Sequence, residues 1–269
     1  MTTPVLEAKK VTMQFGGLKA LVDFDLTLLP GELVGMIGPN GAGKTTAFNA
    51  ITGVYPPSSG DVLVSGARVN GQRPYQICIA GIARTFQNIR LFKQLTALDN
   101  VRVACHHGRQ AGFTAAFLRT AGFLADEARI ARRAEEFLAV MGLADKRDAL
   151  ARNLPYGEQR RLEIARALAT GPKLLCLDEP AAGMNASEKV ALMDLIQKIR
   201  DQFGLAILVI EHDMRVVMGV SERMVVLDHG VTIARGSPQE IRANPKVIEA
   251  YLGDSYLEEK HMQVPVEAP

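Results

Sequence analysis

The segment Gly38–Thr45 constrains this chain more than any other, because its residues, GPNGAGKT, fit the spacing G-x-x-x-x-G-K-T. Glycines without a Cβ allow backbone N–H groups to curl around a phosphate, and a following helix adds the positive end of its dipole. An apolar segment, Glu32–Ile37, comes directly before the motif, and a helical pattern, Thr45–Thr52, comes after it. A strand, a glycine-rich loop and a helix in this order predict a nucleotide-binding α/β protein.

Every residue of this loop is a candidate nucleotide ligand. We expect Lys44 to neutralise the β- and γ-phosphates, and we expect the Thr45 hydroxyl to ligate Mg²⁺. The residues expected to contact ATP here are Gly38, Pro39, Asn40, Gly41, Ala42, Gly43, Lys44, Thr45 and Thr46.

Two adjacent carboxylates follow a second apolar strand. The segment Leu174–Asp178 has the sequence LLCLD, and Glu179 comes next. In P-loop ATPases a carboxylate at the end of such a strand holds Mg²⁺. An acid beside it is placed to orient and deprotonate an attacking water. We therefore expect Asp178 to be a metal ligand and Glu179 to be the catalytic base, with ATP and Mg²⁺ as the cofactors.

Composition excludes several other classes of protein. The chain has 31 basic and 29 acidic residues, a net charge of +2, which argues against a nucleic-acid partner. Its cleanest apolar run, Leu205–Ile210, has six residues, whereas a membrane helix needs about 18. The opening MTTPVLEAKK has no apolar signal-peptide region, and the 3 cysteines have no CxxC spacing. We therefore expect a globular, cytoplasmic protein.

The pattern of apolar residues predicts the organisation of the domain. Strands alternate with helices, which implies a mostly parallel core sheet, and the early strands are expected to form an antiparallel β layer. Residues 95–169 show helical spacing instead, as in Ile130, Ala134 and Phe137, and predict an inserted α-helical subdomain. The expected strands are Val5–Met13, Phe24–Leu28, Glu32–Ile37, Asp61–Val64, Lys173–Leu177, Ala206–Ile210, Met224–Leu227 and Val231–Ala234.

The C-terminal part of the chain predicts a helical extension over residues 237–253. Ser237 as N-cap, Pro238 at the first helical position and Glu240 at the third form a capping box. A further helix brings Val247 and Tyr251 to one face, and we expect that face to pack on the protein. We expect one domain over residues 1–253 and a disordered tail over residues 254–269.

Taken in order along residues 5–253, these motifs resemble the ATP-binding subunits of ABC transporters, and the resemblance implies the P-loop ABC-ATPase fold. It implies that Phe15 stacks on the adenine ring. It also implies that Gln87 is the Q-loop glutamine, with a metal-binding and a catalytic role, and that His212 is the catalytic switch histidine. The segment Ala181–Asn185 corresponds to the D-loop of these proteins.

The resemblance also identifies a signature segment, Asn153–Gln159, which in this family contacts the ATP bound to the opposite subunit. The family pattern is LSGGQ, but here the sequence is LPYGE, and the D-loop aspartate is replaced by Asn185. These departures, together with the RTFQ sequence that ends at Gln87, are similar to those of LivG-type subunits of branched-chain amino-acid importers. The signature residues implied to contact nucleotide are Pro155, Tyr156, Gly157 and Glu158.

The resemblance implies an ATPase that powers uptake of leucine, isoleucine and valine from the cytoplasmic face of the cell membrane. Two separate membrane-spanning permease subunits would form the pore, and an extracytoplasmic solute-binding protein would deliver the solute. A coupling helix of the permease is expected to dock in a groove near Gln87. A second ATP-binding subunit is the expected partner, as a heterodimer or as a second copy of this chain.

Three alternatives remain open from the sequence. The first is the ATPase of a related importer for other amino acids, urea or amides. The second is a lipopolysaccharide-type exporter ATPase, and the third is a non-transport ABC ATPase. The solute itself is bound by other subunits, so this chain does not encode its identity directly.

Overall fold

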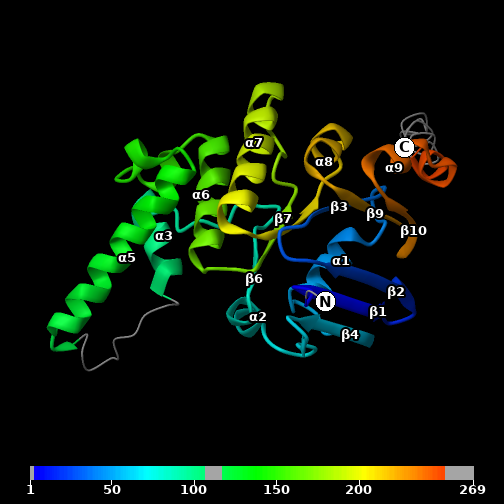
Figure 1. The fold of residues 1–269 in the computed structure, drawn as a ribbon, viewed down its shortest axis with the longest axis horizontal. Coiled ribbons are helices and arrows are strands. Elements are labelled where there is room, and N and C mark those ends of the chain that lie inside the picture. Colours follow the sequence, from blue (N-terminus) through cyan, green and yellow to red (C-terminus); the bar gives the residue numbers. More distant parts are fainter. Residues whose placement is uncertain (1–2, 107–116, 252–269) are drawn as a thin grey trace, which may run out of the picture.

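The computed structural model describes residues 3–106 and 117–251 of the 269-residue chain. Its first sheet is antiparallel, with strand order β2-β1-β4-β5. In Figure 1 this sheet lies beside the N-terminus, and helix α1 lies between it and the central sheet. The strands are β1 (Leu6–Phe15), β2 (Leu18–Leu28), β4 (Ser59–Val64) and β5 (Ala67–Arg68).

The second sheet forms the centre of the protein and has the order β10-β9-β3-β8-β7-β6. Its neighbouring strands are parallel, except that β10 pairs antiparallel with β9. The predicted fold class, a mostly parallel core sheet with an antiparallel β layer, is confirmed. The strands are β3 (Leu33–Ile37), β6 (Ile82–Arg84), β7 (Leu174–Asp178), β8 (Ala206–Ile210), β9 (Arg223–Asp228) and β10 (Val231–Gly236).

Six of the helices described below form two groups, which do not include α1 and α2. Helices α3, α5 and α6 lie together at one end of the molecule and form the inserted helical subdomain, while α7, α8 and α9 lie along the central sheet (Figure 1). The helices are α1 (Lys44–Ile51), α2 (Pro74–Ala80), α3 (Ala97–Cys105), α5 (Ala121–Val140), α6 (Tyr156–Ala169), α7 (Ala186–Phe203), α8 (Met214–Val220) and α9 (Pro238–Ala243).

Several predicted boundaries were wrong. The strand expected at Phe24–Leu28 begins at Leu18, because its first part carries exposed polar residues on the open face of an antiparallel sheet. The three-residue strand β6 and the short helix α2 were not predicted, since neither is long enough to show a period.

In the β9–β10 turn, His229 and Gly230 both have positive φ, 43° and 78°, as a two-residue type I′ turn requires.

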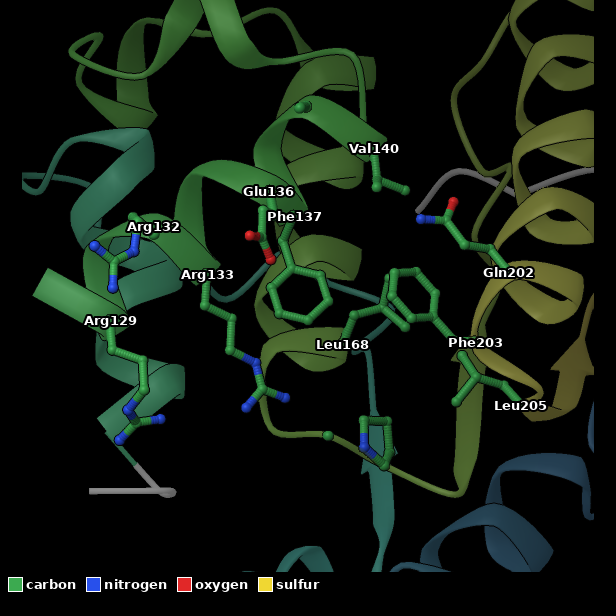
Figure 2. Close-up of a pocket in the computed structure, with 13 residues that line it drawn as sticks. Arg129, Arg132, Arg133, Glu136, Phe137, Val140, Leu168, Gln202, Phe203 and Leu205 are labelled. Atoms are coloured by element: carbon green, nitrogen blue, oxygen red, sulfur yellow. The ribbon is translucent and has the colours of Figure 1, made fainter. Parts of the chain in front are cut away.

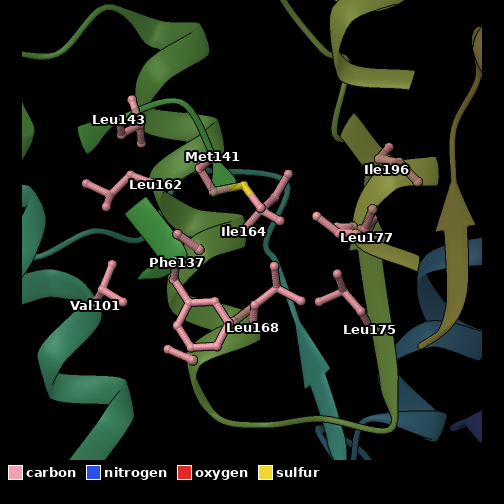
Figure 3. Packing of buried hydrophobic residues seen from close by; sticks show 14 of the residues in the cluster. Val101, Phe137, Met141, Leu143, Leu162, Ile164, Leu168, Leu175, Leu177 and Ile196 are labelled. Atoms are coloured by element: carbon pink, nitrogen blue, oxygen red, sulfur yellow. The ribbon is translucent and has the colours of Figure 1, made fainter. Parts of the chain in front are cut away.

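The central sheet is buried on both faces, which explains why its strands are almost continuously apolar. Leu175 and Leu177 of β7 pack against the helices, and Figure 3 shows them facing Ile164, Leu168 and Ile196. The alternate residues Leu174 and Cys176 belong to the cluster on the opposite face, together with α1 and the antiparallel sheet. This packing fixes the carboxyl end of β7, where Asp178 lies.

Gly35, in the middle of β3, permits an unusually close approach of α8. A Cβ built at Gly35 would lie 2.3 Å from Val217 Cγ1 and 2.6 Å from Ser221 Oγ, which is closer than side chains tolerate. Helix α8 follows His212, and β3 leads into Gly38. The two segments therefore belong to one tightly packed unit.

The C-terminal helices lie on the central sheet. The Ser237 hydroxyl caps α9 by accepting a hydrogen bond from Glu240 N, and the Glu240 carboxylate accepts one from Ser237 N. Residues 245–251 are also helical. Ile241 and Val247 are 1% and 3% exposed and share a cluster with Met224 and Val226 of β9. The expected end of this helix at Gly253, and the predicted tail over residues 254–269, lie outside the described residues.

We expect amide hydrogen exchange to report this packing in the isolated subunit. Replacing Val247 by aspartate places an unpaired charge in an apolar cluster and should speed exchange through residues 247–251. The matched control is the same replacement, by aspartate, at Ile248, which is 46% exposed. It should leave exchange unchanged. Rapid exchange through this segment in the unmodified subunit would show that the packing does not persist in solution.

Candidate nucleotide-binding and hydrolysis site

The loop between β3 and α1 has the backbone of a phosphate cradle. Gly38, Gly41 and Gly43 have positive φ, and a Cβ at Gly38 would lie 2.1 Å from the Leu227 carbonyl oxygen. Gly43 is the N-cap of α1 and offers no side-chain acceptor to the first N–H groups of the helix. Lys44 Nζ donates to the carbonyl oxygens of Gly38 (2.6 Å) and Pro39 (2.7 Å). A helix N-terminus, a glycine loop and a lysine fit a bound phosphate chain.

Asp178 and Glu179 extend the same edge of the sheet. Asp178 is 5% exposed, and its backbone N–H donates to Thr85 Oγ1 over 3.2 Å. Burial raises the pKa of the Asp178 carboxyl, while the Arg84 guanidinium, 3.6 Å away, opposes the shift. Glu179 adopts a left-handed backbone with φ 45°, and its N–H donates to the Ile210 carbonyl (2.9 Å). Glu179 is thus the first residue after β7, which ends at Asp178.

The Glu179 carboxylate is the point where the three predicted catalytic side chains meet. Gln87 Nε2 donates to Glu179 Oε2 over 3.1 Å. His212 Nδ1 lies 3.8 Å from Glu179 Oε1 and belongs to the segment after β8. Residues 87, 179 and 212 thus converge from three separate parts of the chain. The arrangement suits a carboxylate that accepts a proton while its neighbours hold its orientation.

Comparison with known proteins agrees with this geometry. The family model described as "ABC transporter" matches residues 21–182, and one described as "Branched-chain amino acid ATP-binding cassette transporter" matches residues 231–256. The chain belongs to the ABC transporter family. It therefore carries an ATP-binding domain with ATPase activity.

Individual relatives match along almost the whole chain. The high-affinity branched-chain amino acid transport ATP-binding protein LivG of Escherichia coli K12 is 44% identical, covering 95% of this chain and 100% of LivG. The corresponding protein BraF of Pseudomonas aeruginosa has the same identity and coverage. The crystal structure of the ADP conformation of MJ1267, an ABC transporter cassette, is 28% identical with a TM-score of 0.81. The match covers 94% of this chain and 100% of that cassette.

The segment predicted to be the signature lies at the start of α6. Pro155 is the N-cap and provides no side-chain acceptor, and Tyr156, Gly157 and Glu158 form the first turn. The Tyr156 hydroxyl accepts a hydrogen bond from Arg160 Nη2 (3.2 Å), and its ring lies against Gly183 of the D-loop. Tyr156 is thus 45% exposed, while its hydroxyl and its ring both contact residues of its own subunit.

Asn185, which replaces the D-loop aspartate, caps α7. Its side-chain Oδ1 accepts from Glu188 N (3.0 Å), and Glu188 Oε2 accepts from Asn185 N (2.9 Å). Asparagine and aspartate are equally good N-caps, so the substitution preserves the start of the helix.

Phe15 and Thr45 lie at exposed positions of the predicted nucleotide site. Phe15 is the last residue of β1, is 45% exposed, and meets the Tyr55 ring edge-on with centroids 5.4 Å apart. Thr45 is exposed in the first turn of α1. The adenine-stacking and metal-binding roles expected for these residues remain predictions.

Sequence reasoning assigned no role to two charged residues beside the site, the partly buried Arg84 and the buried Glu211. Arg84 lies between the rings of Phe48 and Phe86, with its guanidinium carbon 4.7 Å from each centroid. Glu211 is 1% exposed and accepts a hydrogen bond from Ala181 N over 2.7 Å. Burial raises the pKa of Glu211, and the Ala181 bond opposes that shift. The position of Arg84 three residues before Gln87 was the only local signal, because a buried charge leaves no periodic pattern.

A groove near the Q-loop separates the α/β core from the helical subdomain. It encloses about 420 Å³, and its lining includes Tyr75 (59% exposed), Phe86, Phe92 (49% exposed), Val103 and Arg166. The Arg166 guanidinium carbon lies 5.6 Å from the centroid of the Phe92 ring. Phe86, the neighbour of Gln87, lines this groove, and the docking of a permease helix near Gln87 stays a prediction.

A larger cavity, of about 800 Å³, lies elsewhere, between α5, α6 and the end of α7. Figure 2 shows Arg129 and Arg133 at one side of it and the neighbouring rings of Phe137 and Phe203 across its floor. None of the predicted ATP-site residues lines this cavity.

Within residues 3–106 and 117–251, no helix has the length and apolar character needed to cross a bilayer.

Proposed function

We propose that this chain is the ATP-hydrolysing subunit of an importer for leucine, isoleucine and valine. The observation that carries the proposal is the convergence of Gln87 and His212 on Glu179, at the edge of the central sheet where β3 leads into the glycine loop. The solute class is supported by the branched-chain amino acid names of LivG and BraF and by the family match over residues 231–256.

Gly38–Thr46 would bind the phosphates of ATP, and Phe15 would stack on the adenine. Thr45, Gln87 and Asp178 would hold Mg²⁺, which when bound offsets negative charge on the phosphates. Asp178 suits this role because it lies at the carboxyl end of β7, and carboxylate oxygens are preferred ligands of a hard cation. Burial raises the pKa of Asp178, and a bound cation, like the Arg84 guanidinium 3.6 Å away, would favour its anionic form.

Glu179 would take the proton from the attacking water. The hydrogen bond from Gln87 uses Oε2, which leaves Oε1 to act as the base. His212 lies 3.8 Å from Oε1, where its ring would help to hold the reacting groups in place. Since Glu179 N–H is fixed by the Ile210 carbonyl, the carboxylate is held from the backbone as well as from its neighbours.

The groove beside the Q-loop would receive a cytoplasmic helix of a permease subunit. Its exposed apolar residues, Tyr75, Phe92 and Val103, offer an apolar surface, and Arg166 adds a positive charge at its wall. Two permease subunits would hold the ATPase at the cytoplasmic face of the membrane. A solute-binding protein would act on the other side, without direct contact.

The signature sequence favours a second, different ATP-binding subunit as the partner. Proline at position 155 has neither the hydroxyl nor the N–H that a serine would offer to the opposite nucleotide. Both sites of a homodimer would share this loss, whereas a heterodimer would keep one site with a full signature. The first turn of α6 would still provide helix N–H groups at each site.

Pro155→Ser is expected to raise the ATPase rate of this subunit alone by about tenfold or more, because one charge-assisted hydrogen bond is restored. Pro155→Ala, which restores the N–H without the hydroxyl, is the matched control and should give a smaller increase. Steady-state ATPase assays, with and without the second ATPase from the same operon, provide the measurement. High activity of the subunit alone, unchanged by either variant and by the partner, would contradict the heterodimer proposal.

The solute is tested by purifying the assembled complex from membranes and reconstituting it into vesicles with its binding protein. We expect ATPase activity to rise with leucine, isoleucine and valine, and to stay at the basal rate with urea, amides and polar amino acids. Stimulation by urea alone would indicate the related importer class. Co-purification with lipopolysaccharide-binding subunits, without amino-acid stimulation, would indicate the exporter.

A further inference from the structure

We propose that Arg160 is a positioning residue that links the Q-loop of this subunit to its signature turn, with Tyr156 as the last member of the link. The inference rests on the proposed ATP site and two-subunit arrangement. Its central residue, Arg160, has no role in the family motifs, and its experiment does not depend on which solute is transported.

Arg160 is the largest fully buried side chain among the described residues, with 0% exposure. Its charge is balanced one turn later by Glu163, which is 2% exposed and lies 2.9 Å from Arg160 Nη1. A buried ion pair of this kind adds little net stability compared with apolar residues of similar size. Arg160 Nε is buried without a hydrogen-bond partner in the described part of the chain, so the network is not arranged for stability alone.

The Arg160 guanidinium holds two consecutive carbonyl groups of the Q-loop. Nη1 donates to Phe86 O over 2.6 Å, and Nη2 donates to Gln87 O over 2.8 Å. The planar fork of arginine allows both bonds at once, which a lysine could not reproduce. The backbone of Gln87 is therefore fastened to α6, while its side chain bonds to Glu179.

Glu163 extends the same attachment further along the loop. Its Oε1 accepts a hydrogen bond from Arg90 N over 3.1 Å. The Arg90 guanidinium carbon in turn lies 4.3 Å from the centroid of the Phe86 ring. Residues 86–90 are thus held near both ends by a single turn of α6.

The link reaches the signature through Arg160 Nη2, which also donates to the Tyr156 hydroxyl over 3.2 Å. Tyr156 is in the first turn of α6, and its ring lies against Gly183 of the D-loop. Because a helix moves as a rigid element, a shift of the Gln87 carbonyl is passed to this turn. Gln87 belongs to the nucleotide site of its own subunit, whereas the signature faces the site of the partner. Arg160 therefore connects the two ATP sites of the dimer.

Hydrogen exchange on the isolated subunit tests the link without measuring activity. The probe is Mg²⁺ with a non-hydrolysable ATP analogue, at a protein concentration at which size-exclusion chromatography shows a monomer. In the unmodified protein we expect the analogue to slow exchange at residues 86–90, through Arg160 at residues 159–163, and through Tyr156 at residues 183–186. Residues 159–163 are chosen because their helical N–H groups exchange slowly enough to follow.

Arg160→Lys keeps the charge beside Glu163 but removes the fork, and Tyr156→Phe removes only the hydroxyl. We expect both variants to bind the analogue within about twofold of the unmodified affinity, since neither group contacts this subunit's own phosphate loop. In Arg160→Lys the response at residues 159–163 should be lost, while the response at residues 86–90 remains. Tyr156→Phe should lose the response only at the signature turn. Exchange at residues 183–186 reports on that turn, because the Tyr156 ring lies against Gly183.

Arg161→Lys is the matched control, because the neighbouring Arg161 donates to the Met141 carbonyl (3.1 Å) instead. It should keep every nucleotide response. A purely structural role for Arg160 would speed exchange equally with and without nucleotide, and would overturn the proposal. Persistence of the response at residues 159–163 in Arg160→Lys would overturn it too. If Arg160→Lys does not fold, an unchanged response at residues 183–186 in Tyr156→Phe would be sufficient to refute the link.

Discussion

Replacing Glu179 by glutamine is expected to leave ATP binding intact and to lower turnover by about 100-fold or more, because a general base contributes a factor of this order. The amide keeps the size of the side chain and can still accept the 3.1 Å hydrogen bond from Gln87. It cannot take a proton from water. The measurement is ATP affinity by fluorescence titration together with steady-state hydrolysis in the assembled transporter.

Glu222→Gln is the matched control for this experiment. Glu222 has a half-exposed side chain that pairs with Arg200 over 2.7 Å, away from the glycine loop. It should retain full turnover, since an exposed ion pair contributes little. Retention of most activity by Glu179→Gln would mean that another group removes the proton, and the assignment of the base would be wrong.

Lys44→Ala is expected to weaken ATP binding itself by about 10- to 100-fold, because it removes a charge-assisted contact of about 1.5–3 kcal/mol. The structure adds a second consequence. Lys44 Nζ also holds the carbonyls of Gly38 and Pro39, so the loop loses two internal hydrogen bonds. Calorimetric titration with ATP and Mg²⁺ measures the loss.

Lys9→Ala serves as the control for a lost lysine charge. The Lys9 side chain is 57% exposed and pairs with Glu7 at the surface of β1. Its removal should leave ATP affinity unchanged within about twofold. If Lys44→Ala bound ATP as tightly as the unmodified protein, Lys44 would not be the phosphate ligand that its position in the loop suggests.

The fold could be predicted wherever the sequence carries a local signal. The central strand β8 was predicted with its observed bounds, because a continuous apolar run between a glycine and a charged residue is typical of a strand buried on both faces. Strand β6 could not be predicted, since three residues are too few to show a period. Its pairing partner, β7, is also distant in the sequence. The antiparallel start of β2 was missed for a different reason: its exposed face carries polar residues that hide the strand.

The site divides in the same way. Lys44 and Asp178 lie in motifs that a sequence displays directly, whereas Gln87 and His212 were found only through the family resemblance. Only its place in the RTFQ sequence marked Arg84, and no sequence pattern assigned a role to Arg160, because the Asp178 carboxylate beside Arg84 and the carbonyl groups that Arg160 binds come from other segments of the chain. A buried arginine is recognised only when its partners are known, and those partners are set by the fold.

The close contact at Gly35 makes the chemistry sensitive to a residue that touches no substrate. One added methyl group would press on Val217 and Ser221 and force α8 away from β3. The displaced helix begins two residues after His212, and the displaced strand ends one residue before Gly38. A selection for loss of transport should therefore recover changes deep in the sheet, behind the ATP site, among those in the motifs themselves.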